Sequence, residues 1–156
     1  MTDLISLPHY LQSAAGSCLA ACVRMVLAHW GSAASEEEVA ELLGINLWGV
    51  RASAIRRLSR WGWDVDYGRG ARVDLAQWLQ REIPVIAFVR TDFLEYWETD
   101  VGHAIVVVGM NDEQVHLHDP VMEKGPVSIS AISFDAAWTE MDYGYAVIIP
   151  ESNEMC

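Results

Sequence analysis

The sequence has few cysteines, and their number and spacing do not suit a disulfide-stabilised protein. Cys18, Cys22 and Cys156 make an odd count, and the first two lie only four residues apart. This pattern fits a reducing compartment in which a thiol can stay free for chemistry. We therefore expect a cytoplasmic protein.

Positive charge and long apolar runs are also scarce. The chain carries 10 Lys and Arg against 22 Asp and Glu, a formal net charge of −12. Such a surface repels phosphate backbones and anionic headgroups, so nucleic acid is not an expected partner. It could attract basic peptides, but solubility alone is the simpler explanation. No apolar run approaches the roughly 20 residues of a membrane span. Residues 1–8 lack the basic start of a secretory signal, so neither membrane insertion nor secretion is expected.

The chain is rich in apolar residues: 52% of its residues are hydrophobic, and seven are Trp. This composition is that of a folded globular protein, and 156 residues suffice for one domain with a buried core. We expect a single domain over residues 1–156, without internal repeats or low-complexity linkers.

Apolar spacing predicts helices in the first half of the chain and strands in the second half. Residues 18–30 are apolar almost all round, which predicts a buried helix, and Ser35 with Glu38 forms a capping box for the next helix. The predicted helices are 18–30, 35–44, 50–61, 74–81 and 134–141, the last beginning near Ser133. The predicted strands are 63–67, 84–90, 103–109, 114–119, 126–130 and 144–149. Helices followed by an antiparallel sheet make an α+β fold.

The hairpin formed by strands 103–109 and 114–119 brings two polar residues together. If the hairpin is symmetric about Asn111, His103 faces Asp119 directly on an otherwise apolar face of the sheet. Directly opposed residues have Cβ atoms about 5 Å apart, so the carboxylate can hold an imidazole N–H. The alternative is a His–Asp pair that only caps the end of the sheet.

Two residues near the N-terminus complete a candidate catalytic set. Cys18 stands where the buried helix begins, and backbone N–H groups at a helix start favour a thiolate. By itself, such a cysteine is more often a small buried hydrophobe than a functional thiol, and this is how we interpret Cys22 one turn later. Gln12 lies six residues before Cys18, where its amide and the Cys18 N–H could hold an oxyanion.

The ordered motif Gln12, Cys18, Gly102-His103 and Asp119-Pro120, with an apolar strand after the His, resembles a known family. It is similar to the bacteriocin-processing double-glycine peptidases, the papain-like cysteine peptidase domains of peptide-exporting ATP-binding-cassette transporters. The resemblance extends from about Leu7 to Ile149. It implies a papain-like fold in which Cys18 is the nucleophile.

By the same resemblance, His103 is the general base and acid, Asp119 orients the imidazole, and Gln12 is the oxyanion donor. The implied reaction is cleavage of a small precursor peptide after a Gly-Gly or similar small-residue site, because bulky side chains would clash in a narrow cleft. The implied partners are a peptide or protein substrate and a separate peptide exporter. One departure is that this chain has Ser17-Cys18-Leu19 where the family has Asp-Cys-Gly, which could alter access to the thiol.

Two other functions stay open at this stage. The same triad can transfer an acyl group to an amine or remove a side-chain amide, and pocket shape decides between these reactions. A non-catalytic module that binds a leader peptide could also keep the fold.

Other candidate residues are weaker. His116 and His118 share a strand face that could bind zinc, but no further ligand cluster has metal spacing, so we expect surface histidines, no metal and no cofactor. His9 and His29 have no evident reason to reach Cys18. Trp48, Trp97 and Trp138 could line a groove or belong to the core.

Overall fold

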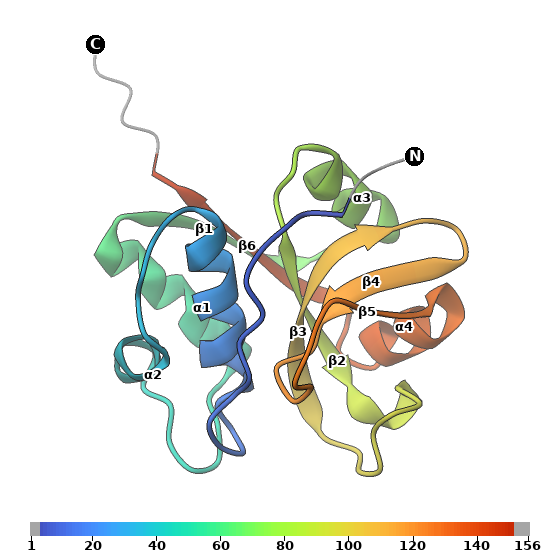
Figure 1. The fold of residues 1–156 in the computed structure, drawn as a ribbon, viewed down its shortest axis with the longest axis horizontal. Coiled ribbons are helices and arrows are strands. Elements are labelled where there is room, and N and C mark those ends of the chain that lie inside the picture. The colour runs from blue at the N-terminus through green and yellow to red at the C-terminus, as the bar shows by residue number, and fades with distance from the viewer. Residues whose placement is uncertain (1–3, 152–156) are drawn as a thin grey trace.

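A six-stranded antiparallel sheet lies at the centre of the computed structural model, which describes residues 4–151 (Figure 1). The strand order is β1-β6-β2-β3-β4-β5, so the last strand, β6, lies between β1 and β2 and joins the two halves of the chain. The strands are β1 (Trp63–Arg69), β2 (Val85–Arg90), β3 (Gly102–Met110), β4 (Gln114–His118), β5 (Val127–Ser130) and β6 (Gly144–Pro150).

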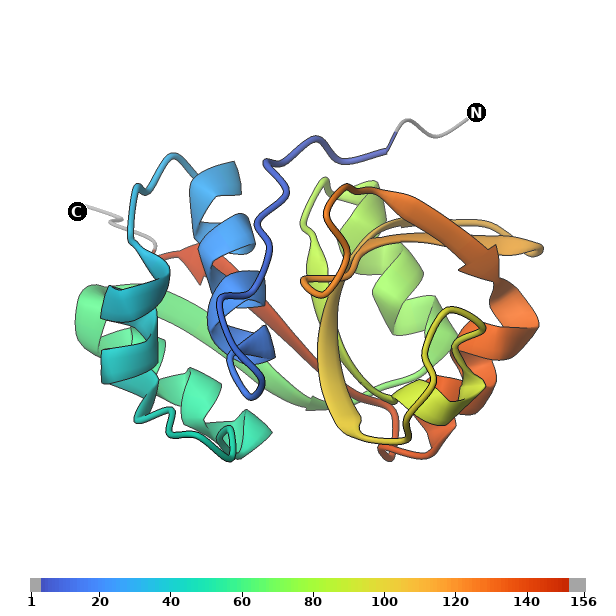
Figure 2. The ribbon, with the colours of Figure 1, turned by 60° about the horizontal axis from the view of Figure 1, so that its bottom comes forward.

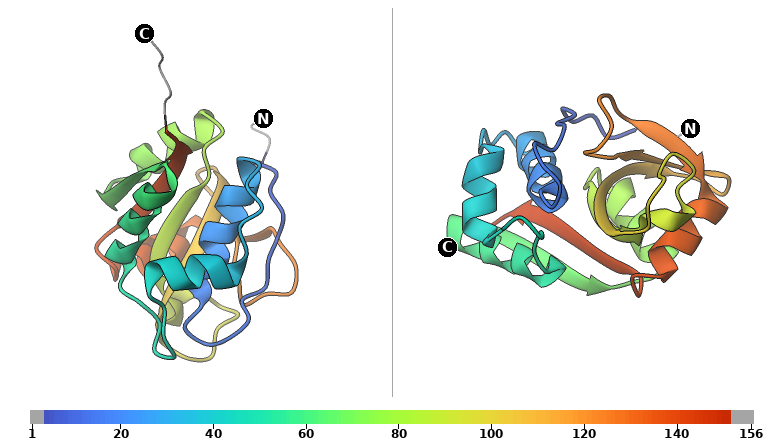
Figure 3. Two further views of the ribbon diagram at one scale, coloured as in Figure 1. Left: turned by 90° about the vertical axis from the view of Figure 1, so that its left-hand side faces the viewer. Right: turned by 90° about the horizontal axis from the view of Figure 1, so that it is seen from below.

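Helices pack on the sheet in two groups. The α-helices are α1 (Cys18–His29), α2 (Glu36–Leu43), α3 (Arg72–Gln80) and α4 (Ala131–Thr139), and the 3₁₀ helices are η1 (Ala52–Trp61) and η2 (Thr91–Phe93). α1 packs against α2 and β3, and η1 packs against β1, whereas α4 packs against β2. Figure 3 shows α1, α2 and η1 gathered at one side of the molecule and α4 at the other. The predicted α+β class is confirmed.

α1 is buried, as its apolar composition predicts. Eight of its 12 residues are buried, and Cys22, Val23 and Met25 have no exposed surface. The chain enters α1 through Gly16, whose φ of +87° is a conformation that suits glycine, and α1 begins at Cys18. The sequence therefore predicts both the position of this helix and its burial.

The predicted helix over 50–61 is a 3₁₀ helix in the structure. Its buried residues, Ile55 and Leu58, are three apart, and half-buried Ala52 continues the series. Three residues per turn place such a series in one line, whereas an α-helix would rotate it around the axis. Gly62 ends this helix with a positive φ of 85°.

Other helix starts are fixed by short polar side chains. The predicted capping box of α2 is present, because Ser35 and Glu38 each bond the other's backbone N–H. α3 begins before Asp74, because this carboxylate caps from the third helical position by accepting from the Ala71 N–H at 2.7 Å. In α4, Ser130 Oγ accepts from the Ser133 N–H at 3.0 Å, so the helix begins earlier than predicted.

The N-terminal segment (residues 4–17) crosses between α1 and the β3–β4 hairpin before it enters α1 (Figure 2). Near its start the Ile5 N–H donates to the Val108 carbonyl at 3.0 Å, and further on the Gln12 N–H donates to the Pro120 carbonyl at 2.7 Å. These bonds hold the segment beside the end of β4. Over residues 4–151, no helix is both long and apolar enough to span a membrane.

Candidate active site

Cys18 is the first residue of α1, and the local chain leaves the start of this helix open. Ser17 provides no side-chain cap, because its hydroxyl bonds the Ala14 backbone instead, accepting from the N–H at 3.1 Å and donating to the carbonyl at 2.7 Å. The first backbone N–H groups of a helix have no acceptor within it. The Leu19 N–H and the Ala104 backbone both bond the Cys18 thiol and lower its pKa.

The departures at Ser17 and Leu19 do not block the thiol. Leu19 is 4% exposed and belongs to the core, so its side chain lies away from the cleft. Ser17 is 7% exposed and holds the turn before α1. Cys18 remains half-buried and lines a cleft. The altered loop is therefore compatible with access to the sulfur.

His103 and Asp119 are in contact, although the predicted hairpin register is wrong. Val107 pairs with Leu117 rather than Val115. The reason is the turn: the Asn111 N–H donates to the Gln114 carbonyl at 2.9 Å. The Asn111 carboxamide oxygen also accepts from the N–H groups that follow it in the turn. These bonds centre the turn after Asn111 instead of on it.

A β-bulge in β3 places Asp119 on the same sheet face as His103, where the turn alone would not place it. Without it, Asp119 would stand opposite Val106, on the sheet face away from His103. The register shifts by one residue between Val107 and Gly109, which returns Asp119 to the His103 face. The two side chains then meet diagonally, with 2.6 Å between His103 Nε2 and Asp119 Oδ1.

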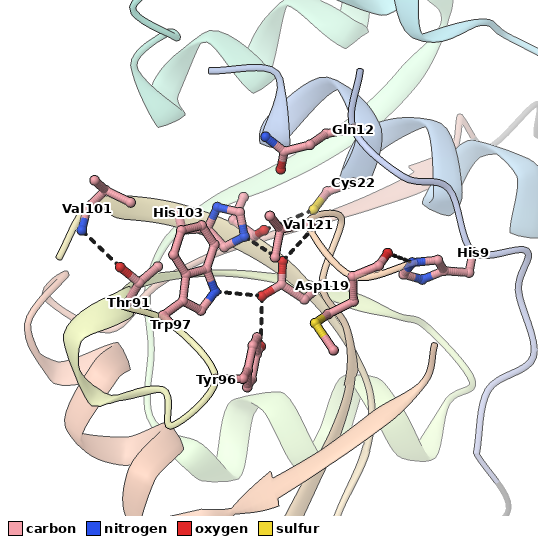
Figure 4. A network of polar contacts seen from close by, with 12 residues as sticks. His9, Gln12, Cys22, Thr91, Tyr96, Trp97, Val101, His103, Asp119 and Val121 are labelled. Atoms are coloured by element: carbon pink, nitrogen blue, oxygen red, sulfur yellow. Dashed lines mark hydrogen bonds and ion pairs between the residues drawn. The ribbon is translucent and has the colours of Figure 1, made fainter. Parts of the chain in front are cut away.

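Asp119 is a fully buried carboxylate that accepts four hydrogen bonds (Figure 4). Oδ1 accepts from His103 Nε2 and, at 3.0 Å, from the Val121 N–H. Oδ2 accepts from the Tyr96 hydroxyl at 2.7 Å and from Trp97 Nε1 at 3.0 Å. Burial alone raises the pKa of Asp119, but these bonds, led by the one from His103, lower it below its ordinary value.

Tyr96 is a site residue that the sequence did not identify, and Trp97, which the sequence left as a groove or core residue, binds the Asp119 carboxylate as well as lining the cleft. Burial and the neighbouring carboxylate raise the pKa of Tyr96, so its hydroxyl stays protonated and can donate. The Trp97 ring also packs edge-on against the His103 imidazole, with 4.8 Å between centroids. Both residues follow η2 in an irregular loop, and a loop gives no periodic signal that would place them beside β4.

The thiol and the imidazole shift each other's pKa. Burial alone raises the pKa of Cys18, but its hydrogen bond to His103 and the charge of that ring lower it below 9.0. Burial alone lowers the pKa of His103, but Asp119 and Cys18 together raise it to about 9. Both directions favour a thiolate beside an imidazolium at neutral pH.

Gln12 lines the same cleft as Cys18. Its Nε2 donates to the Ala14 carbonyl at 2.8 Å, and among the described residues its Oε1 is buried without a hydrogen-bond partner. Figure 4 shows the carboxamide oxygen turned toward the His103–Asp119 network. The structure therefore places this side chain beside the site with its donor end bound elsewhere.

The cleft beside Cys18 has a volume of about 690 Å³ and an apolar rim. Its rim carries large hydrophobic side chains that are 41 to 92% exposed: Leu11, Leu47, Trp48, Val101 and Val121. The loops that bear them meet at the lower end of the molecule in Figure 1, around the start of α1. Trp48 and Trp97 line this cleft, whereas Trp138 is 1% exposed in the core.

Cys22 and the histidines other than His103 do not line the cleft. Cys22 is fully buried and donates to the Ala104 carbonyl at 3.3 Å, as expected of a packing residue, and Cys156 lies outside the described residues. His118 is not a surface histidine: it is 2% exposed and bonds His9. Within residues 4–151, no three His, Cys, Asp or Glu side chains are grouped to hold a metal ion.

A helix-borne thiol set against a His–Asp pair on an antiparallel sheet is the arrangement of a papain-like cysteine peptidase. A family model described as the peptidase C39 family matches residues 6–153, so the chain belongs to that family and is a cysteine peptidase. No curated protein matches the chain.

Solved structures share the fold at low sequence identity. A putative C39-like peptidase from Bacillus anthracis has a TM-score of 0.78 and 17% identity over 96% of this chain and 98% of that chain. The peptidase domain of Streptococcus ComA, a bifunctional ABC transporter involved in a quorum-sensing pathway, has a TM-score of 0.75 and 22% identity, with 94% and 99% covered. A double glycine motif protease from an AMS/PCAT transporter, in complex with the leader peptide, has a TM-score of 0.73 and 23% identity, with 94% of each chain covered.

Proposed function

We propose that the protein cleaves a peptide bond with Cys18 as nucleophile, His103 as general base and acid, and Asp119 as the residue that orients the imidazole. The observation that carries the proposal is the hydrogen bond between His103 and Asp119 beside a cleft that both Cys18 and His103 line. Because Asp119 occupies Nε2 of His103, the other ring nitrogen, Nδ1, is left to exchange a proton with the sulfur.

In the proposed reaction the Cys18 thiolate attacks the carbonyl carbon of the scissile bond, and the carbonyl oxygen becomes an oxyanion. The Cys18 backbone N–H and the Gln12 amide would hold that oxyanion. His103 then gives its proton to the leaving amine as the C–N bond breaks, which leaves a thioester on Cys18. Water, deprotonated by His103, hydrolyses the thioester and restores the thiol.

The oxyanion role requires one local movement of Gln12. Its Nε2 donates to the Ala14 carbonyl, and the end that lies toward the network is the unpaired Oε1. Half a turn of the carboxamide would exchange the two ends and present N–H groups to the cleft. A substrate oxyanion, as a charged acceptor, would bind such a donor more strongly than the Ala14 carbonyl does.

The cleft supports an apolar peptide as substrate. Its five exposed hydrophobic rim residues would contact such a segment, and the small residues Ala15, Gly16 and Gly102 also line the cleft. One of the similar structures is a double glycine motif protease in complex with a leader peptide. We accordingly propose a small precursor peptide cut after a Gly-Gly or similar small-residue site.

The proposed partner is a separate peptide exporter that would receive the processed product, since two of the similar structures are transporter peptidase domains. The proposed compartment is the cytoplasm, where reducing conditions keep the thiols of Cys18 and Cys22 free.

Mass spectrometry of peptide products tests the proposed reaction. The purified protein is incubated with a library of extended peptides, each with one Gly-Gly pair after an apolar segment, in the presence and absence of a competing amine. Cleavage after Gly-Gly that is lost in Cys18→Ala and kept in the matched Cys22→Ala control is the expected result, because only Cys18 lines the cleft.

The other outcomes point to the other functions. Products that carry the competing amine in place of water identify an acyl transferase, and loss of a side-chain amide identifies an amidase. Peptide binding without any product identifies a binding module. Cleavage by Cys18→Ala at the wild-type rate would refute Cys18 as the nucleophile.

A further inference from the structure

Two histidines form a direct pair on the side of Asp119 away from the cleft. His9, in the N-terminal segment, and His118, the last residue of β4, have their Nδ1 atoms 2.9 Å apart. Their rings stack with centroids 5.1 Å apart and an interplanar angle of 28°. The second nitrogen of His9, Nε2, lies 2.6 Å from the Met122 carbonyl oxygen. Neither histidine lines the cleft.

The acceptor on Met122 fixes where the protons of this pair are. A carbonyl oxygen only accepts, so His9 Nε2 must carry a hydrogen. In a neutral His9 ring, Nδ1 is then a lone pair, and the hydrogen in the contact between the rings belongs to His118 Nδ1. His118, on β4, therefore donates a hydrogen bond to His9 in the N-terminal segment. His9 in turn donates one to Met122 in the loop after β4.

Gly125 allows the two rings to approach each other. A Cβ atom at this position would lie 2.5 Å from His118 Nδ1 and 2.6 Å from His9 Nδ1, which are distances that packed atoms do not adopt. Only glycine therefore lets the loop after β4 close over the contact. Glu123 and Lys124 of the same loop are both exposed.

The pair stands between two residues of the candidate site. His9 lies three residues before Gln12, whose backbone N–H donates to the Pro120 carbonyl at 2.7 Å. His118 directly precedes Asp119, which holds His103. The N-terminal segment, which carries Gln12, is therefore bonded to the residue before Asp119 and to the residue after it.

We propose that His9 and His118 are positioning residues that hold Gln12 in register with the Cys18–His103 pair. This inference rests on the proposed function, because it assigns the histidines a role in oxyanion binding. Loss of the pair would leave the thiolate formed, since Asp119 and its four donors stay in place. It would release the N-terminal segment, and the Gln12 amide would no longer face the oxyanion.

Two probes separate these effects. Iodoacetamide alkylates the Cys18 thiolate and needs no oxyanion donor. A short peptide aldehyde, acetyl-glycyl-glycinal, adds the thiol to its carbonyl, and the hemithioacetal oxygen so formed occupies the oxyanion position. The ratio of the two responses therefore reports on Gln12 independently of the thiolate.

The variants are His9→Ala, which removes both bonds of the ring, and His118→Asn, whose side-chain N–H can still donate to His9 Nδ1. His116→Ala, on the same strand with its ring bonded to the Ser128 hydroxyl, is the matched control. For His9→Ala we expect aldehyde binding about 10- to 100-fold weaker, approaching the effect of removing one oxyanion donor. Its alkylation rate should stay within about twofold of the wild type, and His118→Asn and His116→Ala should bind the aldehyde as the wild type does.

The possible outcomes test the positioning role of the two histidines and the proposed function separately. Unchanged aldehyde binding in His9→Ala overturns the positioning role, and so does a parallel loss of alkylation and aldehyde binding, which would show a general structural defect. If His118→Asn does not fold, His9→Gln, which keeps only the donor to Met122, takes its place and should weaken aldehyde binding. A wild-type protein that is alkylated by iodoacetamide but does not bind the aldehyde would instead refute the proposed function.

Discussion

Replacing Asp119 with asparagine tests the electrostatics of the site with a nearly isosteric change. The carboxylate accepts two hydrogen bonds at each oxygen, and an amide replaces one of those oxygens with a donor. If the amide nitrogen takes the place of Oδ2, Trp97 Nε1 loses its acceptor. If it takes the place of Oδ1, the Val121 N–H loses its acceptor. One buried donor left unpaired costs about 1–3 kcal/mol. A total stability of roughly 5–15 kcal/mol keeps such a variant folded.

The larger effect of Asp119→Asn concerns the thiol. Burial lowers the pKa of His103, and Asp119 together with Cys18 raises it to about 9, so this pKa falls when the carboxylate is removed. A neutral imidazole no longer stabilises a thiolate, and burial, which raises the pKa of Cys18, then dominates. We expect the pH midpoint of iodoacetamide alkylation to move upward and peptide cleavage to fall by about 10²- to 10⁴-fold.

The assay is the alkylation rate measured from pH 5 to pH 10 and read by mass spectrometry, with urea unfolding to confirm that the variant is folded. Asp92→Asn is the matched control, because it makes the same change at an exposed position in η2. Superposable pH profiles for wild type and Asp119→Asn would refute the claim that the buried carboxylate controls the thiol.

Two further predictions concern stability. Gly16→Ala should lower the free energy of unfolding more than Gly31→Ala, since both have φ near +87° but a Cβ at Gly16 would lie 2.8 Å from the Gly49 nitrogen. Urea denaturation measures the difference, and equal losses would show that this contact is unimportant. Burial and His9 lower the pKa of His118 to about 4, whereas the unfolded chain takes up this proton near pH 6.5. The contribution of His118 to the free energy of unfolding should therefore be complete above pH 6.5 and fall by up to about 3 kcal/mol toward pH 4. A wild-type protein as stable to urea at pH 4.5 as at pH 7 would contradict this.

The sequence predicts Cys18, His103 and Asp119 as a set from the hairpin and from the resemblance of the ordered motif to a peptidase family. The apolar run over residues 18–30 predicts where α1 lies, and strands of period two predict that His103 and Asp119 stand at one end of a hairpin. The contact between His103 and Asp119 is present in the structure. The register is not predictable in the same way, because the Asn111 turn and the bulge at Val108 each shift it and only their sum returns Asp119 to the correct face.

The sequence by itself determined the α+β class and the burial of α1, since each follows from composition and spacing along a few turns of chain. The tertiary structure alone decided what surrounds the candidate catalytic residues: Tyr96 and Trp97 on the Asp119 carboxylate, and the bond between His9 and His118. His9, Tyr96 and Trp97 lie in irregular segments, and His9 is 109 residues from His118 in the chain, so no periodicity predicts these contacts. Only the folded chain brings them together, because the packing of loops against the sheet is set by the whole core and not by local sequence.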